Sequence, residues 1–263
     1  MNVIRGTGVA SGAAVVLVAM LAACGSGGSA SQSSATYAPG GTLRVSMGSA
    51  PESLDPQSGY SSESEEADWL VYTPLLTYAH QAGAAGEQLI PGLATALPVV
   101  SDGGKTYTMT LRKGLKFSTG APVTASDFTY TIERAIKLWG GAGFFTNIAG
   151  AAAYQAGKAT GISGISTDNA TGQITVHLVR PYGAFDNVLA FPAAGLIPAG
   201  TPMSVQSVSP PPGVGPYKIT SVQPNRSFTL QKNPLFAGFD IPGIPAGYVS
   251  AVQVTIQSNL IAR

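Results

Sequence analysis

Residues 107–136 read YTMTLRKGLKFSTGAPVTASDFTYTIERAI and contain the clearest structural signals in the chain. Apolar and polar side chains alternate over Thr106–Leu111, which predicts a strand with one buried face. Gly114 marks a turn after this strand. Thr124 then lies three residues before Asp127, the spacing of a capping box, so a helix is predicted to begin there.

The helix that follows has one apolar face. Phe128, Ile132, Ala135 and Trp139 recur at helical spacing, so we expect this face to be buried. Arg134 falls on the opposite side of the same helix and is expected to be exposed to solvent.

Outside this stretch, further elements follow from pattern alone. A second helix is predicted to begin within residues 62–68, where serines can cap it and carboxylates meet the positive end of its dipole. Other alternating runs predict strands at 42–47, 173–178, 217–222, 227–231 and 252–256. Short strands mixed with two clear helices predict an α/β fold, or α+β mixed, without repeats.

The N-terminal residues have the order of an export signal. Arg5 precedes an uncharged apolar segment that is too short to remain as a membrane span, and Leu21-Ala22-Ala23-Cys24 follows. This run resembles the lipobox of bacterial lipoproteins, in which the cysteine is acylated. We therefore expect residues 1–23 to be a lipoprotein signal peptide, Cys24 to be lipidated, and residues 24–40 to form a flexible tether.

The composition excludes several classes of function. In 263 residues, 14 Lys and Arg balance 13 Asp and Glu for a net charge of +1, so no basic field for nucleic acid is expected. With Cys24 as the only cysteine, no disulfide can form within the chain. These features favour an exported protein whose fold rests on packing.

No catalytic or metal-binding pattern stands out. His177 lies in an alternating run and is expected on a solvated strand face, while His80 is expected on a loop surface. Neither has the context of a zinc site or a catalytic triad. The carboxylates in residues 62–68 lack the glycine-punctuated loop of a calcium site, and the helix dipole accounts for them. We expect no enzyme activity, no metal and no cofactor.

The stretch from 107 to 136 resembles the signature of the extracytoplasmic solute-binding proteins of family 5, the peptide- and nickel-type components of ABC importers. The matching positions are Leu111, Arg112, Gly114, Lys116, Phe117, Gly120, Pro122, Thr124, Ala125 and Asp127. Further matches occur in the same order at 53–57, 72–76, 213–219 and 230–234. Together they cover essentially all of residues 41–257.

The resemblance implies a periplasmic-binding-protein-like type II fold, with two hinged lobes that close on a ligand. In peptide-binding members the ligand is held in extended form, largely through its main chain. The positions that resemble the cleft wall, and are therefore candidate ligand-binding residues, are Tyr60, Ser61, Ser62, Val214 and Gly215. A structural alternative stays open, in which 60–62 only lead into a helix and 213–215 only form a turn.

Family members are about twice as long as this chain, so we expect an N-terminal half whose second lobe is missing. Residues 41–60 and 182–263 would form the first lobe, and 61–181 the inserted subdomain of family 5. The implied function is that of a monomeric, lipid-anchored substrate-binding component on the extracytoplasmic face of the cell membrane. It would serve an ABC permease and bind peptides or another small solute. The alternatives are a non-transporting surface lipoprotein without a complete cleft and, less in keeping with the residues, an exported hydrolase.

Lipidation at Cys24 can be tested by substitution. Each buried acyl CH₂ contributes about 0.8 kcal/mol, so two or three acyl chains should hold the protein firmly in the membrane fraction of a bacterial host. We expect Cys24→Ser to move it to the soluble fraction. Equal release of the two forms would contradict the anchor.

Overall fold

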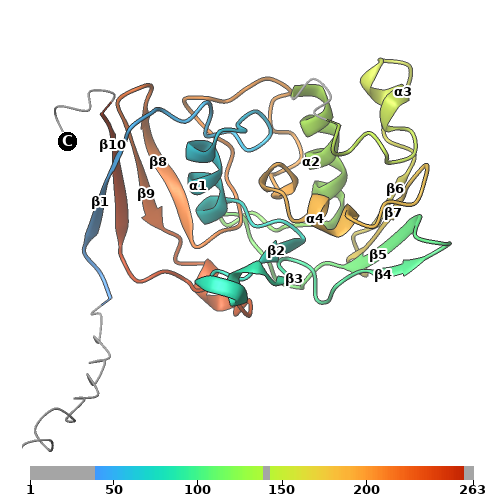
Figure 1. Ribbon diagram of the computed structural model, residues 1–263, viewed down its shortest axis with the longest axis horizontal. Helices are drawn as coiled ribbons and strands as arrows, with labels where there is room; N and C mark the ends of the chain where they lie inside the picture. The colour runs from blue at the N-terminus through green and yellow to red at the C-terminus, as the bar shows by residue number, and fades with distance from the viewer. Residues whose placement is uncertain (1–38, 139–142, 258–263) are drawn as a thin grey trace, which may run out of the picture. The chain divides into compact units, whose positions relative to one another are not determined.

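The computed structural model describes residues 39–138 and 143–257, whose strands form three sheets (Figure 1). The first is ordered β1-β10-β9-β8, the second pairs β2 with β3, and the third is ordered β4-β5-β7-β6. The strands are β1 (Thr42–Met47), β2 (Leu76–Tyr78), β3 (Leu89–Pro91), β4 (Val99–Ser101), β5 (Thr106–Thr110), β6 (Ile165–Asp168), β7 (Gln173–His177), β8 (Tyr217–Gln223), β9 (Ser227–Lys232) and β10 (Ala251–Ile256).

The α-helices are α1 (Ser62–Val71), α2 (Ala125–Leu138), α3 (Ala151–Gln155) and α4 (Phe185–Leu189), and short 3₁₀ turns cover 83–87, 192–194 and 236–239. Within the described ranges, no helix is both long and apolar enough to cross a bilayer. The mixed α/β fold and the predicted long strands are confirmed. The strands β2, β3, β4 and β6 were not predicted, because three or four residues are too few to show a period.

The first sheet joins the two ends of the described chain. β1 pairs in parallel with β10, Thr42 opposite Ala251, while β9 is antiparallel to both β10 and β8. Ala67 and Val71 of α1 pack in one buried cluster with Leu230 of β9. This contact places α1 on one face of the sheet.

The third sheet is antiparallel throughout and packs with α2. Phe128 and Ile132 are fully buried in one cluster with Ile174 of β7, as the helical spacing predicted. Trp139, the last residue of the predicted face, lies outside the described residues. His177 is exposed at the end of β7, also as predicted.

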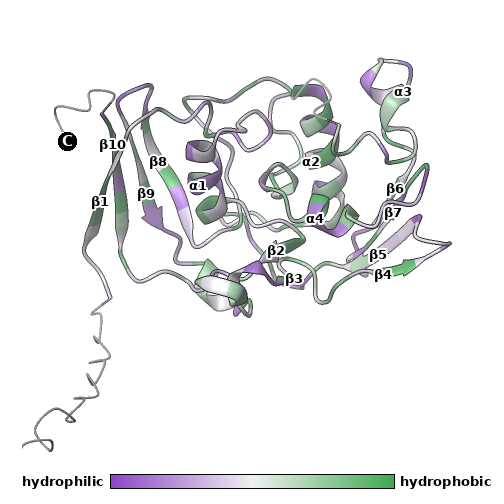
Figure 2. Ribbon diagram, viewed as in Figure 1, coloured by the Kyte–Doolittle hydropathy of each residue, from purple (hydrophilic) through white to green (hydrophobic). Residues whose placement is uncertain are grey.

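Side chains fix the start of both long helices. The Asp127 carboxylate accepts hydrogen bonds from the backbone N–H of Thr124 at 2.7 Å and from its hydroxyl at 2.9 Å, which confirms the predicted helix start. The Ser61 hydroxyl caps α1 by accepting from the N–H of Ser64. Figure 2 shows α1 hydrophilic over its first turns and more hydrophobic toward its end.

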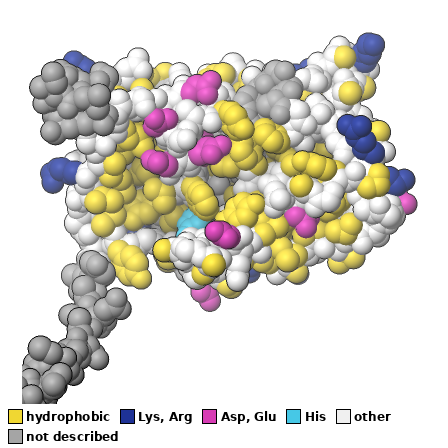
Figure 3. All heavy atoms as spheres, in the orientation of Figure 1, with side chains coloured by type: hydrophobic (Ala, Val, Ile, Leu, Met, Phe, Trp, Pro, Cys, Tyr) yellow, Lys and Arg dark blue, Asp and Glu magenta, His cyan; other side chains and the backbone are white. Residues whose placement is uncertain are grey.

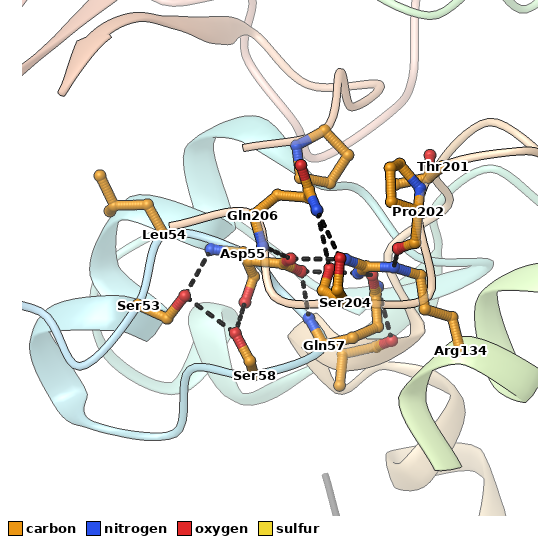
Figure 4. Close-up of polar contacts among 12 residues, drawn as sticks. Ser53, Leu54, Asp55, Gln57, Ser58, Arg134, Thr201, Pro202, Ser204 and Gln206 are labelled. Carbon is orange, nitrogen blue, oxygen red and sulfur yellow. Dashed lines mark hydrogen bonds and ion pairs between the residues drawn. The ribbon is translucent and has the colours of Figure 1, made fainter. Parts of the chain in front are cut away.

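Arg134 is buried, so the prediction that it is exposed was wrong. Its side chain is 0% exposed, and its two terminal nitrogens lie 2.6 and 2.7 Å from the Asp55 carboxylate (Figure 4). The remaining N–H groups donate to the Gln57 side chain and to the backbone carbonyls of Pro202 and Ser204, at 2.7–2.8 Å. All five guanidinium donors are therefore used. These hydrogen bonds and the ion pair offset the desolvation cost of burying the charge.

This ion pair connects three segments that are distant in sequence. Asp55 comes from the loop after β1, Arg134 from α2, and the accepting carbonyls from residues 202–204. The backbone N–H of Gln206 also donates to Asp55, at 2.8 Å. The loop after β1 and residues 202–206 thus cover the side of α2 that faces away from the sheet. Helical periodicity alone does not reveal this contact.

Asp68 of α1 also departs from the expectation that it interacts with the helix dipole in solvent. The side chain is 0% exposed, and neither carboxylate oxygen has a hydrogen-bond partner in the described structure. Burial, with a smaller effect from the Asp55 and Glu65 charges, raises the pKa of Asp68 well above its usual value. The ionised form of Asp68 is therefore disfavoured in the folded protein.

Loss of the Arg134 side chain should lower the stability of the folded protein strongly. Arg134→Ala leaves the buried Asp55 charge without its partner, so we expect a loss of about 3–5 kcal/mol in the free energy of unfolding. Urea unfolding monitored by circular dichroism measures this difference. Arg226→Ala, at an exposed arginine, serves as the control and should change stability by no more than about 0.5 kcal/mol. Equal unfolding midpoints for the two variants would contradict the assignment.

Asp68 should make stability depend on pH. Its pKa is higher in the folded state than the value of about 3.9 expected in the unfolded chain, so its full contribution is present below pH 4 and is lost as pH rises. Asp68→Asn removes this loss and should stabilise the protein by about 1 kcal/mol or more at pH 8, with little difference at pH 4. Glu66→Gln, at an exposed position of α1, is the control in thermal melts at both pH values. A constant difference between Asp68→Asn and the parent across this range would disprove the explanation.

Candidate ligand-binding cavity

The predicted residues 60–62 lie at the start of α1. Tyr60 is 53% exposed, Ser61 caps the helix, and Ser62 is its first residue. The Ser61 hydroxyl also accepts from the backbone N–H of Glu52 at 3.3 Å. Ser61 therefore has a local structural role and Ser62 is an exposed first residue of the helix, while Tyr60 presents its ring at the surface.

Val214 and Gly215 lie in a tight turn against the end of α1. Val214 is fully buried, and its carbonyl accepts from the backbone N–H of Thr73 at 3.1 Å. A side chain at Gly215 would place its Cβ 2.6 Å from the Leu70 carbonyl oxygen, so only glycine permits this approach. The turn has a clear packing role, and a ligand contact there stays a prediction. Cys24 lies outside the described residues.

A cavity of about 420 Å³ opens beside α1, β2 and α4. This volume falls within the range of small-molecule sites in proteins. Its wall is mostly aromatic and aliphatic, and includes Glu65, Trp69, Tyr72, Pro74, Thr77, Tyr78, Phe144, Tyr182, Ala184, Asn187, Val188, Ala190, Phe191 and Pro192. Figure 3 shows hydrophobic side chains gathered on the face that these elements occupy in Figure 1.

Three aromatic rings connect the predicted loop to this cavity. Phe144 and Phe191 have ring centroids 5.0 Å apart, and Tyr60 lies 6.2 and 5.8 Å from them. We call Tyr60, Phe144 and Phe191 the aromatic cluster. Sequence analysis missed both phenylalanines, because each lies in an irregular segment where no periodicity marks a buried or ligand-facing position.

The polar groups of the cavity are few. The Tyr78 hydroxyl donates to the Asn187 side-chain oxygen at 3.0 Å, which connects β2 to α4 across the wall. Glu65 provides the carboxylate, and partial burial raises its pKa. Within the described chain, the wall therefore combines large apolar surfaces with one acidic group and uncharged hydrogen-bonding groups.

His80 packs against the Trp69 ring, so the prediction that it lies on a loop surface holds only in part. Its ring is half-buried and meets the Trp69 ring edge-on, with centroids 5.3 Å apart. Burial lowers the pKa of His80 to about 4, so the imidazole is neutral at pH 7. It also borders a neighbouring cavity of about 480 Å³ that includes Asp240 and Ile241.

The acidic residues of α1 do not converge on one point. Glu63 accepts a hydrogen bond from Ser49, which lowers its pKa, whereas Glu65 lines the cavity and Asp68 is buried. No group of three or more metal-ligating side chains is found in residues 39–138 and 143–257.

Solved structures share this fold. A clavulanic acid biosynthesis oligopeptide-binding protein matches 84% of this chain and 41% of its own length, with a TM-score of 0.71 and 26% identity. A Listeria monocytogenes OppA bound to peptide matches 83% and 43%, with a TM-score of 0.69. At 20% identity, the second likeness concerns the fold alone.

Sequence relatives point to the same group. The chain is 28% identical over 237 residues to the dipeptide-binding protein DppE of Bacillus subtilis, which covers 87% of this chain and 42% of DppE. It is 29% identical over 212 residues to the glutathione-binding protein GsiB of Escherichia coli K12, covering 76% and 36%. The chain thus spans about two-fifths of the length of these curated relatives.

The sequence pattern of the bacterial extracellular solute-binding proteins, family 5, matches residues 88–259. The match includes the strand and helix formed by residues 107–136, and both the third sheet and most of the first. Since it covers more than half of the chain, this protein belongs to family 5 of the bacterial extracellular solute-binding proteins.

Proposed function

We propose that this protein is the extracytoplasmic substrate-binding component of an ABC importer and that its solutes are peptides. The observation that carries this proposal is the aromatic-lined cavity of about 420 Å³ beside the Tyr60 loop, in a chain of family 5. A cavity with apolar walls and a few convergent polar groups is the usual form of a binding site for small organic solutes.

The relatives support peptides as the solute class. Three of them are named as binding proteins for dipeptides, glutathione and oligopeptides. Peptides can be held through their main chain while one side chain enters an apolar pocket. Tyr60, with its ring beside Phe144 and Phe191, is the residue we assign to this contact.

The proposal includes the protein's place in the cell. Export, lipidation of Cys24 and a tether over 24–40 would keep a monomer at the membrane, close to the permease that receives the solute. The division into a first lobe of 41–60 and 182–263 and an inserted subdomain of 61–181 stays a prediction. We assign the protein a binding role and no enzymatic one.

Peptide binding can be tested by calorimetric titration of the full chain with a pool of tripeptides to pentapeptides. Because the cavity is open on one side, we expect saturable binding weaker than about 10 μM, near −7 kcal/mol. Tyr60→Ala should weaken it about threefold or more, since a stacked ring contributes about 0.5–1.5 kcal/mol. Tyr248→Ala, which removes a 66% exposed ring outside the cavity, is the matched control.

Absence of saturable heat at peptide concentrations up to about 10 mM would overturn the proposal. That outcome would favour the alternative of a surface lipoprotein that does not transport. An equal effect of Tyr60→Ala and Tyr248→Ala would remove Tyr60 from the site.

A further inference from the structure

We propose that this cavity selects solutes in which an aromatic or aliphatic group carries a positive charge, and that Glu65 is the residue that imposes the choice. The inference rests on the proposed solute-binding function and specifies its ligand class. It predicts preference for a cation over an anion of the same shape.

The walls of the cavity suit the apolar part of such a solute. Trp69, Tyr78, Phe144, Tyr182 and Phe191 all border it. Aromatic rings bury large apolar groups, and their faces also attract cations through the ring quadrupole. The ring faces offer no such attraction to a carboxylate.

The charge at the wall has one sign. Glu65 contributes a carboxylate, and among the described residues none that borders the cavity is Lys, Arg or His. The nearest imidazole, His80, lies behind Trp69 and is neutral at pH 7 because burial lowers its pKa to about 4. In Figure 3, acidic side chains lie beside the hydrophobic area, while Lys and Arg lie toward the edges of this face.

In the part of the chain that the structure describes, the Glu65 carboxylate has no ion-pair partner. The ion pairs of the described chain are Arg134 with Asp55 and Lys105 with Asp102, and neither involves Glu65. Burial raises the pKa of Glu65, which means that its ionised form is disfavoured where it stands. A bound cation would offset this cost. The Glu65 carboxylate can therefore form its ion pair with a cationic ligand.

A second feature separates Glu65 from its neighbours on α1. Glu63 is already engaged by Ser49, and Glu66 is exposed on α1 and does not border the cavity. The selectivity should therefore depend on one side chain and not on the general acidity of the helix.

Three probes with the same phenylethyl group and different charges test the inference: 2-phenylethylamine, 2-phenylethanol and 3-phenylpropionate. Ligand-observed NMR titrations of the full chain at pH 7 measure their affinities. We expect the amine to bind at least about fivefold more tightly than the propionate, with the alcohol between them.

Variants identify the source of the preference. Glu65→Gln should remove the difference between amine and propionate and leave the affinity for the alcohol unchanged. Glu66→Gln, one residue along α1, should leave all three affinities unchanged. Phe191→Ala should weaken all three probes, with thermal melts to verify that the variant is folded.

Equal binding of amine and propionate, or equal effects of Glu65→Gln and Glu66→Gln, would overturn the inference. Failure of all three probes would also overturn it. If the peptide pool still binds in that case, the proposed function stands, and if the pool fails as well, both are lost.

Discussion

The ion pair between Arg134 and Asp55 holds together the part of the molecule on which the candidate site depends. Both side chains are withdrawn from water, at a high desolvation cost that only complete hydrogen bonding can offset. The partners come from α2, from the loop after β1 and from residues 202–206. The same loop continues through Tyr60 into α1, so the position of the cavity wall follows from a contact made several residues earlier.

Beside this ion pair, the Gln57 side chain forms hydrogen bonds to two separate segments. The Gln57 side chain accepts from Arg134 and donates to the backbone carbonyl of Ala193 at 3.2 Å. Residue 193 lies in the short helical turn that follows Phe191, so the network extends to the segment that carries one ring of the aromatic cluster. Asp68 departs from this pattern, because both oxygens of its buried carboxylate lack a partner in the described chain, as does one carboxylate oxygen of Asp186.

Sequence reasoning located the elements that show a period and missed contacts that have none. Alternation identified β5 and β7, and hydroxyl–carboxylate spacing identified the start of α2, because both patterns are local. Arg134 was wrongly predicted to be exposed, because helical periodicity shows which face of a helix is polar but not whether another segment packs against that face. Phe144 and Phe191 were missed for a related reason: they come together only through tertiary folding. Tyr60 was predicted as a ligand-binding residue through family resemblance and not through any pattern in the chain.

The pairing of β1 with β10 has a consequence for how the protein reaches its native state. Thr42 aligns with Ala251, so the first strand of the sheet has no partner until almost the whole described chain has emerged. At about 5–20 residues per second, that interval lasts roughly 10–40 s. Parallel pairing between segments so far apart is slow to form, and Leu43 of β1 remains about half exposed even in the folded sheet. During synthesis, this strand is therefore open to aggregation until β10 is made.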